Sequence, residues 1–370
     1  MGVTIGLMSG TSLDGVDGVL ARAGEHGRWQ VLAHAHRPFP AALRLELLAL
    51  NDSGDDELHR AAVAGNALTA IYAEVVMALR KAGGVAAGGV AAIGAHGQTV
   101  RHRPGEFDGS GYTLQLINGA LLAELTGIDV VCDFRSRDVA AGGQGAPLVP
   151  AFHAACFGQP GRDRAVLNLG GIANLTLLDA DGTVRGFDTG PGNVLLDLWC
   201  QSRRALPYDA EGTWASGGPV DADLLAKLRA EPYFGRAPPK STGRDLFRSA
   251  WLEARLGGEV RDDRAVMSTL AELTASTVAD ALRESAPSCE ELLVCGGGAF
   301  NADLLRRIGS RLGGRVRVAS TAEAGVPPDQ VEALAFAWLA AAFLARQPGN
   351  LPAVTGARGP RVLGALYPAA

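Results

Sequence analysis

A chain of 370 residues is longer than the roughly 250–300 residues at which single hydrophobic cores stop growing, so its length predicts two domains. Hydrophobic residues make up 47% of the chain and charged residues 20%, as is typical of a packed globular protein. The net charge of −5 provides no basic field, which argues against a nucleic-acid partner.

The cysteines and the apolar runs indicate the compartment. The five cysteines are scattered without a Cys-x-x-Cys pair, which favours a reducing cytosol over a disulfide framework or a zinc site. No basic region precedes the first apolar run, and Asp14 and Asp17 interrupt that run, so we expect no signal peptide. The longest apolar run, 333–345, is shorter than the ~20 residues of a membrane span. We therefore expect a cytoplasmic protein without a membrane partner.

The first part of the chain alternates strand and helix patterns, which indicates an α/β domain. Apolar spacing and turn residues predict strands at 3–7, 15–21 and 29–36, helices at 41–49 and 58–81, strands at 90–95 and 113–117, a helix at 119–125 and a strand at 128–132. His34 and His36 lie at strand spacing with no acidic partner in view, which predicts an exposed strand, not a metal site. The next segment, 133–150, is rich in glycine and charge, which suits a hinge or binding loop between domains.

The second part opens on a β-hairpin and ends on an apolar helix. The patterns predict a hairpin at 164–179, a strand at 182–187, a helix at 268–285, a strand at 291–295, and helices at 301–312 and 331–345. Prolines around Pro232 and Pro238 predict surface loops. The last helix is apolar on nearly every face and is expected to be buried.

Two stretches of the chain, 5–20 and 164–179, share one pattern: an apolar strand, a tight turn of small residues and a second apolar strand. Small residues let backbone N–H groups and hydroxyls approach a phosphate chain closely. A glycine triplet, Gly296 to Gly298, follows a later strand. Each feature alone is explained by an ordinary turn, but their order together predicts a clamp on phosphate groups. The chain has no P-loop motif, which closes that route to nucleotide binding. It also has no clean Gly-x-Gly-x-x-Gly after a strand, which weakens a dinucleotide-binding interpretation.

Six motifs carry a resemblance to a known family. They are Gly6-Leu-Met-Ser-Gly-Thr-Ser-Leu-Asp-Gly-Val-Asp17, Gly94-Ala-His-Gly-Gln-Thr99, Ala141-Gly-Gly-Gln-Gly-Ala-Pro-Leu-Val-Pro150, Leu167-Asn-Leu-Gly-Gly-Ile-Ala-Asn174, Gly186-Phe-Asp-Thr-Gly-Pro-Gly-Asn193 and Cys295-Gly-Gly-Gly-Ala-Phe-Asn301. In these motifs the chain resembles the anhydro-N-acetylmuramic acid kinases, which belong to the actin, sugar-kinase and seventy-kilodalton heat-shock superfamily. The resemblance extends from residue 5 to the helix at Glu332, nearly the whole chain.

The resemblance implies a fold and an activity. The fold would be two actin-like (ribonuclease H-like) α/β domains around an ATP cleft, with residues 1–138 and 139–345 as the domains and 346–370 packing back on the first. The activity would be ATP-dependent and Mg²⁺-dependent: opening of the 1,6-anhydro ring of an amino sugar, 1,6-anhydro-N-acetylmuramic acid, with phosphorylation of O6, in cell-wall recycling. Members of the family are typically homodimers, and the apolar helix at 331–345 is a candidate for the interface.

The candidate nucleotide contacts come from the two hairpins and from the glycine triplet that would hold the adenosine. They are Gly10, Thr11, Ser12, Leu13, Asp14, Gly15, Val16, Asp17, Asn168, Gly170, Gly171, Asn174, Gly296, Gly297, Gly298 and Asn301. Asp14 is also the candidate Mg²⁺ ligand, since Mg²⁺ commonly takes one or two carboxylates beside phosphate oxygens. A turn-capping role explains Asp14 equally well, and asparagine is a common turn former.

Asp188 is the candidate catalytic residue. It follows a predicted strand and lies among glycines that leave room for a ligand, which suits a general base, although an Asx-turn would also place an aspartate there. The resemblance implies that this carboxylate activates the water that attacks the anomeric carbon.

The candidate substrate contacts are His96, Gln98, Arg135 and Glu332. A structural hydrogen bond is the alternative for His96. An arginine can bind the substrate's lactyl carboxylate through two parallel bonds, and an interdomain ion pair is the competing explanation. Glu332 opens a helix, where the helix dipole alone would favour a carboxylate.

Two other functions remain open at this stage. One is a kinase of the same superfamily that phosphorylates a different sugar. The other is a non-enzymatic ATP-dependent switch, although the chain lacks a separate peptide-binding domain.

Overall fold

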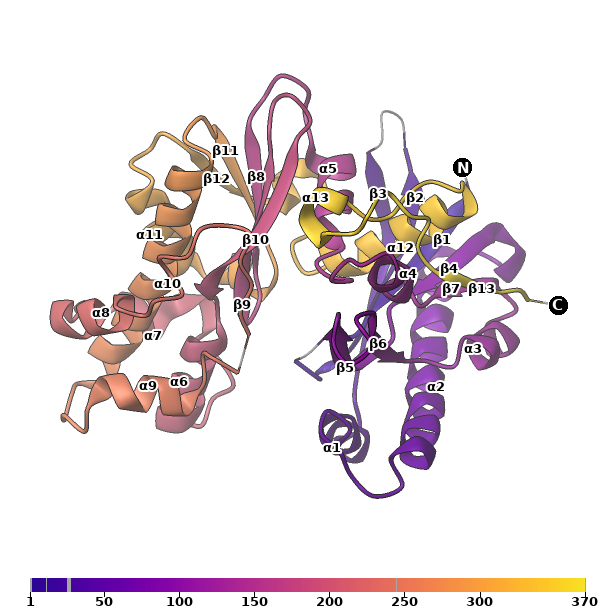
Figure 1. The fold of residues 1–370 in the computed structure, drawn as a ribbon, viewed down its shortest axis with the longest axis horizontal. Helices are drawn as coiled ribbons and strands as arrows, with labels where there is room; N and C mark the ends of the chain where they lie inside the picture. Colours follow the sequence, from indigo (N-terminus) through magenta and orange to yellow (C-terminus); the bar gives the residue numbers. More distant parts are fainter. Residues whose placement is uncertain (1, 11, 25–27, 244, 370) are drawn as a thin grey trace. The chain divides into compact units, whose positions relative to one another are not determined.

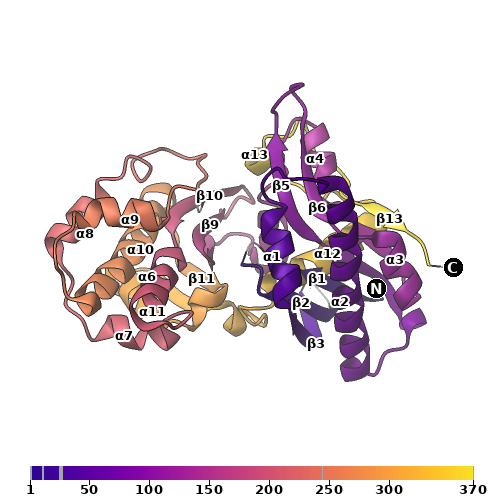
Figure 2. The same ribbon diagram turned by 90° about the horizontal axis from the view of Figure 1, so that it is seen from below.

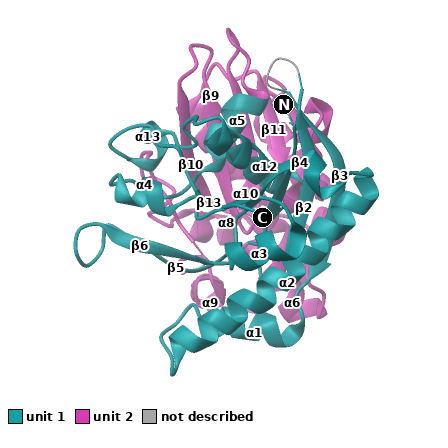
Figure 3. Cartoon of the chain, turned by 90° about the vertical axis from the view of Figure 1, so that its right-hand side faces the viewer, with its two compact units in different colours: residues 1–156, 330–370 teal, residues 157–329 magenta. Residues whose placement is uncertain are grey.

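The computed structural model describes residues 2–10, 12–24, 28–243 and 245–369, and it divides into two compact units. Unit 1 comprises residues 1–156 and 330–370, and unit 2 comprises residues 157–329 (Figure 3). The chain therefore crosses between units near 156/157 and 329/330, whereas the sequence suggested 138/139 and 345/346. The difference arises because residues 139–156 and the helix at 331–344 belong to unit 1.

Unit 1 is built on a six-stranded sheet with the order β13-β7-β4-β1-β2-β3 (Figure 1). Its strands are β1 (Val3–Met8), β2 (Gly15–Ala23), β3 (Trp29–Pro38), β4 (Val90–Ala95), β7 (Val130–Cys132) and β13 (Ala365–Tyr367). The first three strands are antiparallel neighbours, while β4 and β7 run parallel to β1. The C-terminal strand β13 pairs antiparallel with β7.

Unit 2 repeats the same strand order in a five-stranded sheet, β10-β9-β8-β11-β12. Its strands are β8 (Arg164–Leu169), β9 (Ile172–Leu178), β10 (Val184–Pro191), β11 (Glu291–Cys295) and β12 (Arg317–Ser320). Again three antiparallel strands are followed by two that run parallel to the first. This shared order confirms the predicted fold class, two related α/β domains of the actin-like type, and extends the repeat beyond the opening hairpins.

Helices cover both sheets. Those of unit 1 are α1 (Ala41–Ala49), α2 (Glu57–Gly83), α3 (Gly119–Thr126), α4 (Ser136–Ala140), α12 (Val331–Leu344), α13 (Pro352–Thr355) and the short η2 (Ala87–Gly89), with α5 (Val149–Phe157) ending at the unit boundary. Those of unit 2 are α6 (Val194–Arg204), α7 (Thr213–Ser216), α8 (Ala222–Arg229), α9 (Ser249–Leu256), α10 (Asp263–Ser285), α11 (Ala302–Arg311) and the short η3 (Ala210–Gly212), η4 (Gly297–Phe300) and η5 (Thr321–Ala324). A two-stranded ribbon, β5 (Gln98–Pro104) with β6 (Gly111–Leu116), completes unit 1.

The long helices begin and end at residues that suit helix caps. The side chain of Asp262 accepts a hydrogen bond from the Ala265 N–H at the start of α10. Gly84 ends α2 with a φ of 62°, a left-handed conformation that glycine adopts without strain. The predicted helices at 58–81 and 268–285 are confirmed by α2 and α10, each within a few residues at both ends.

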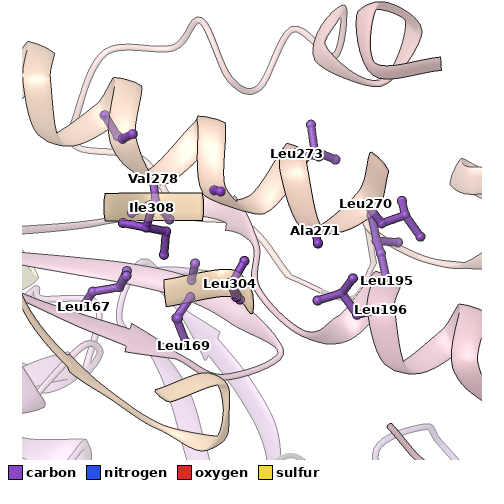
Figure 4. Packing of buried hydrophobic residues seen from close by; sticks show 14 of the residues in the cluster. Leu167, Leu169, Leu195, Leu196, Leu270, Ala271, Leu273, Val278, Leu304 and Ile308 are labelled. Atoms are coloured by element: carbon purple, nitrogen blue, oxygen red, sulfur yellow. The ribbon is translucent and has the colours of Figure 1, made fainter. Parts of the chain in front are cut away.

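The core of unit 2 lies between its sheet and the helices α6, α10 and α11. Figure 4 shows leucines of β8 facing side chains of α10 and α11, among them Leu167, Leu169, Leu270, Leu304 and Ile308, all of them at most 1% exposed. Figure 2 shows α10 surrounded by α6, α8 and α11. Burial on this scale is the main stabilising contribution to the unit.

Helix α12 packs on the sheet of unit 1 at β1 and β4. A Cβ added to Gly6 would lie 1.9 Å from the Ala333 carbonyl oxygen, and one added to Gly94 would lie 2.0 Å from that of Phe336. The helix is therefore buried, as expected, but its apolar side chains are engaged by its own sheet. The suggestion that α12 and its neighbours supply a dimer interface stays a prediction.

One helix among residues 2–10, 12–24, 28–243 and 245–369, α2, is long and apolar enough to pass a length-and-composition test for crossing a membrane. Half of its most apolar stretch is buried, and it packs on β2, β3 and α3. Buried packing of this kind is that of a core helix within a globular unit.

The glycine-rich segment 133–150 lies within unit 1 and contains α4 and the start of α5. The fully buried carboxylate of Asp138 accepts hydrogen bonds from the Gly145 N–H, the Asn350 amide and the Thr355 hydroxyl, at 2.6–2.8 Å. The loop is thus tied to the C-terminal segment, and the expectation that it forms a hinge between domains is wrong.

Candidate functional site

The tip of the first hairpin, between β1 and β2, presents small and polar residues. Ser12 and Asp14 are exposed, and the Ser12 hydroxyl donates to Asp14 Oδ1 at 2.7 Å. A Cβ added to Gly10 would meet nothing closer than 3.8 Å, so the backbone there borders open space. Leu13 adopts a left-handed φ of 55°, and its buried side chain anchors the turn. Thr11, a predicted contact, lies outside the described residues.

The last three predicted contacts of this hairpin have structural roles in unit 1. Gly15 is required by packing, since a Cβ there would lie 2.3 Å from the Arg37 carbonyl oxygen. Val16 is fully buried in the core and pairs with Arg37 of β3. Asp17 faces β3, where its Oδ1 lies 3.0 Å from His36 Nδ1 and 3.4 Å from His34 Nε2. The expectation that these histidines have no acidic partner is wrong, because the antiparallel register places Asp17 opposite His36.

His96 and Gln98 lie against the first hairpin. His96 Nδ1 is 3.1 Å from the Ser9 carbonyl oxygen, and the Gln98 amide donates to the Gly10 carbonyl at 3.1 Å. Both side chains are at most 4% exposed. Gln98 Oε1 is buried and has no hydrogen-bond partner among the described residues. A buried acceptor of this kind costs free energy unless a donor reaches it.

Arg135 joins the same corner of unit 1 from the turn after β7. Its Nε and Nη2 lie 3.1 and 3.0 Å from His96 Nε2, and its Nη1 donates to the Gly145 carbonyl at 2.8 Å. Burial lowers the pKa of Arg135 to about 10, while the carboxylates of Glu332 and Asp138 act in the opposite direction. Arg135 therefore remains a cation at neutral pH. Glu332, in the first turn of α12, adds a carboxylate to this corner.

In unit 2, three polar residues lie side by side on neighbouring strands. Asn168 of β8 is opposite Asn174 of β9, which in turn is opposite Asp188 of β10. Directly opposed residues point to the same face of a sheet. The row lies next to the second hairpin tip, where the Gly170 and Gly171 carbonyls accept hydrogen bonds from the backbone of residues 192–194. The predicted residues of this hairpin are therefore brought together with Asp188.

The Asp188 carboxylate is fixed on both oxygens. The Asn174 amide donates to Oδ1 at 2.8 Å, and the Thr242 N–H donates to Oδ2 at 3.0 Å. Burial raises the pKa of Asp188, and these two hydrogen bonds oppose the rise. A half-buried carboxylate with a raised pKa is better matched to proton abstraction near neutral pH than a fully exposed one.

The glycine triplet follows β11 and packs on the end of β8. Gly296 has a φ of 80°, and a Cβ there would lie 2.4 Å from Asn168 Oδ1, while a Cβ on Gly298 would lie 2.6 Å from Leu169 Cβ. A Cβ on Gly297 would meet nothing closer than 4.0 Å, so this residue borders open space. Asn301 caps α11, since its Oδ1 accepts from the Leu304 N–H at 2.9 Å.

A family model for anhydro-N-acetylmuramic acid kinase matches residues 2–369 of this chain. The chain belongs to this family. A relative of that name from Variovorax paradoxus (strain S110) is 61% identical, over 99% of this chain and 98% of its own length. Another from Bordetella petrii (strain ATCC BAA-461 / DSM 12804 / CCUG 43448) is also 61% identical, over 99% of this chain and 96% of its own. A solved structure, the activator of the 2-hydroxyisocaproyl-CoA dehydratase from Clostridium difficile, aligns over 90% of this chain and 92% of its own at 12% identity, with a TM-score of 0.46.

The sequence did not reveal one segment of unit 2 that holds Asp188. The Tyr233 hydroxyl donates to the Asp188 carbonyl at 2.8 Å, and the Asp188 N–H donates to the Lys240 carbonyl at 3.1 Å. Tyr233 and Lys240 thus satisfy the backbone groups of Asp188 at the free edge of β10, and Thr242 holds its side chain. Tyr233 is 2% exposed, so the prediction of a surface loop near Pro232 is wrong at this residue. The segment has no periodic pattern that would have revealed the contact.

The described residues contain no group of three or more His, Cys, Asp or Glu side chains that could hold a metal ion. The five cysteines are free thiols, four of them buried. A nucleotide-bound Mg²⁺ usually keeps water and phosphate ligands and needs only one or two carboxylates. The exposed carboxylate of Asp14, beside the open Gly10 backbone, fits that requirement.

Proposed function

We propose that this protein opens the anhydro ring of 1,6-anhydro-N-acetylmuramic acid with water and transfers the γ-phosphate of ATP to O6, giving N-acetylmuramic acid 6-phosphate and ADP. The single observation that carries the proposal is the family match over residues 2–369. The site geometry supports it: a half-buried carboxylate beside a glycine-tipped hairpin in unit 2, and a second such hairpin beside an arginine in unit 1.

Asp188 is the proposed general base. Its ionised carboxylate takes a proton from the water that attacks the anomeric carbon, the bond from that carbon to O6 breaks, and O6 attacks the γ-phosphorus as the bond to ADP breaks. The Asn174 amide and the Thr242 N–H hold the carboxylate so that its remaining lone pairs face the water. General-base catalysis of this kind contributes about 10²–10⁴-fold, and the rest of the rate comes from in-line positioning of the phosphate.

The substrate contacts follow from the charges in unit 1. Arg135 is proposed to bind the lactyl carboxylate, and Glu332 and Gln98 to accept hydrogen bonds from the sugar. The unpartnered Oε1 of Gln98 supports this role, because a hydroxyl donor would satisfy it.

The nucleotide is proposed to contact the two hairpin tips and the glycine triplet. Gly10, Gly170 and Gly297 have the open space that close approach of a phosphate or a ribose requires. Mg²⁺ bound at Asp14 would neutralise phosphate charge during transfer. Turnover that continues in excess chelator would contradict this metal role.

A cytoplasmic location and a homodimeric state complete the proposal. Free thiols support a reducing compartment, and the dimer rests on the family's usual state. Sedimentation of the purified chain as a monomer at micromolar concentration would contradict the dimer.

Incubation with ATP, Mg²⁺ and a panel of sugars tests the activity directly. We expect ADP and a sugar 6-phosphate from the anhydro sugar, detected by ³¹P NMR and mass spectrometry, and no product from N-acetylmuramic acid or glucose. Phosphorylation of glucose with the anhydro sugar ignored would assign a different sugar kinase. Binding of ATP without turnover of any sugar would instead favour a nucleotide-dependent switch.

The pH dependence of turnover should reflect the pKa of Asp188. Burial raises that pKa above its usual 3.8, and only the ionised form accepts a proton. The kcat should therefore fall as the pH drops through the raised value, at a higher pH than an exposed aspartate would give. A kcat that stays constant down to about pH 4, measured on protein that remains folded, would exclude Asp188 as the base.

A further inference from the structure

Both ring nitrogens of His96 are engaged within unit 1. Nδ1 lies 3.1 Å from the Ser9 carbonyl oxygen, and Nε2 lies 3.0 and 3.1 Å from Nη2 and Nε of Arg135. A guanidinium only donates hydrogen bonds, so Nε2 is the acceptor. A carbonyl only accepts, so Nδ1 carries the proton. These contacts fix the imidazole as the neutral Nδ1–H tautomer and leave neither nitrogen for the substrate.

The surroundings of the ring also favour the neutral form. His96 is 4% exposed, and its ring packs on that of Phe336, with centroids 4.7 Å apart. Burial and the positive charge of Arg135 lower the pKa of His96 to about 3, although the carbonyls of Ser9 and Gly97 act in the opposite direction. The charged group that faces the ring is thus Arg135, and α12 contributes an apolar ring.

These contacts orient the guanidinium of Arg135. One edge of its guanidinium, formed by Nε and Nη2, is directed at His96, while Nη1 donates to the Gly145 carbonyl. Each terminal nitrogen carries a second N–H. A pair of N–H groups on the two terminal nitrogens is what a carboxylate takes in a bidentate bond.

We propose that His96 is a positioning residue: it accepts hydrogen bonds from Arg135 and so aims the guanidinium at the substrate carboxylate, and it neither contacts the sugar nor transfers a proton. This inference rests on the proposed function, in which Arg135 binds that carboxylate. It replaces the substrate contact expected for His96 from the sequence.

Three variants test this role kinetically. His96→Leu removes the acceptor, so the KM for the anhydro sugar should rise about 10-fold or more while the KM for ATP changes less than about 2-fold. His96→Gln offers an amide oxygen to Arg135 and should recover much of the loss. His59→Gln, at an exposed position on α2, is the matched control and should match the wild type.

Two kinetic outcomes would overturn the proposal. If His96 merely supports the hairpin through Ser9, the KM for ATP should rise and that for the sugar should not. If the KM for the anhydro sugar is as high in His96→Gln as in His96→Leu, the hydrogen-bond acceptor toward Arg135 is unimportant.

A measurement without turnover separates this proposal from the assigned reaction. In protein labelled with ¹⁵N-histidine, the His96 resonances should report a protonated Nδ1 and an unprotonated Nε2 throughout pH 5–8. Titration of His96 in that range, or a protonated Nε2, would overturn the proposal even if all variants fold poorly. If the wild type instead shows the expected tautomer but phosphorylates no anhydro sugar, the proposed function fails and the contact between His96 and Arg135 stands.

Discussion

Asp188→Asn should lower kcat by at least ~10²–10⁴-fold, with the affinity for nucleotide unchanged within a few-fold. The substitution preserves the shape of the side chain and removes its ability to accept a proton. The hydrogen bonds can be kept: the new amide oxygen accepts from the Thr242 N–H, and the amide of Asn174 turns over to accept from the new N–H group. Single-turnover kinetics with ATP and the anhydro sugar would measure the effect on the chemical step.

The Asp188→Asn substitution should affect stability and activity in opposite directions. Asp188 has a raised pKa in the folded protein, so its contribution to the free energy of unfolding is present below the unfolded pKa and is lost as the pH rises through the folded value. At neutral pH the ionised, half-buried carboxylate therefore opposes folding relative to its protonated form. Because asparagine never ionises, Asp188→Asn should unfold at the same or a higher temperature at pH 7.

Asp181→Asn is the matched control. Asp181 is an exposed aspartate in the turn between β9 and β10, where its side chain accepts from the Thr183 N–H at 2.8 Å, a bond that asparagine can also accept. This variant should retain wild-type kinetics and stability. An Asp188→Asn enzyme with most of its activity would reduce Asp188 to a turn residue and remove the proposed mechanism.

The sequence predicted those parts of the site that depend on local chemistry. The hairpin tips at Gly10 and Gly170 follow from turn residues between apolar strands. Asp188 was expected in a turn after a strand at 182–187, but it lies within β10 (Val184–Pro191), paired with Asn174. The pairing of Asn174 with Asp188 depends on the register between β9 and β10. The register of a hairpin depends on the type and length of its turn, and the ladder here also shifts between Asp188 and Gly190. The sequence patterns specified neither feature, so this contact was not predicted.

Contacts made by residues outside the helices and strands could also not be predicted from the sequence. Thr242 belongs to a proline- and glycine-containing stretch with no helical or strand repeat, yet its N–H holds Asp188. The loop 133–150 was predicted as a hinge because of its composition. In the structure the loop is tied to the C-terminal segment through Asp138, whose partners Asn350 and Thr355 lie more than 200 residues away in the chain.

The burial of α12 was predictable from its composition, whereas its close approach to the sheet was not. A helix normally packs on a sheet through side chains on both surfaces. At Gly6 and Gly94 the helix backbone instead lies almost in contact with the strands, and only glycine permits this. The N-terminal turn of α12, which contains Glu332, therefore belongs to the same unit as His96 and Arg135.

Gly94→Ala should therefore destabilise the protein strongly, by about 3 kcal/mol or more. The new Cβ would lie 2.0 Å from the Phe336 carbonyl oxygen and 2.8 Å from its carbonyl carbon, and backbone atoms cannot rotate away as a flexible side chain can. The strand cannot move either, because β4 is paired with β1 on one side and β7 on the other. The helix would have to shift outward and give up the packing of Phe336, Leu339 and Ala340, all at most 2% exposed.

Thermal unfolding followed by circular dichroism measures this effect, and a loss of ~3 kcal/mol corresponds to roughly 6–12 °C in Tm for a unit of this size. Gly65→Ala provides a control of opposite sign. Gly65 is buried inside α2, but a Cβ there would meet nothing within 4 Å, so alanine should stabilise the helix by ~0.5–1 kcal/mol. If Gly94→Ala were as stable as Gly65→Ala, the packing of α12 directly on the backbone of β4 would be wrong, and with it the placement of Glu332 near Arg135.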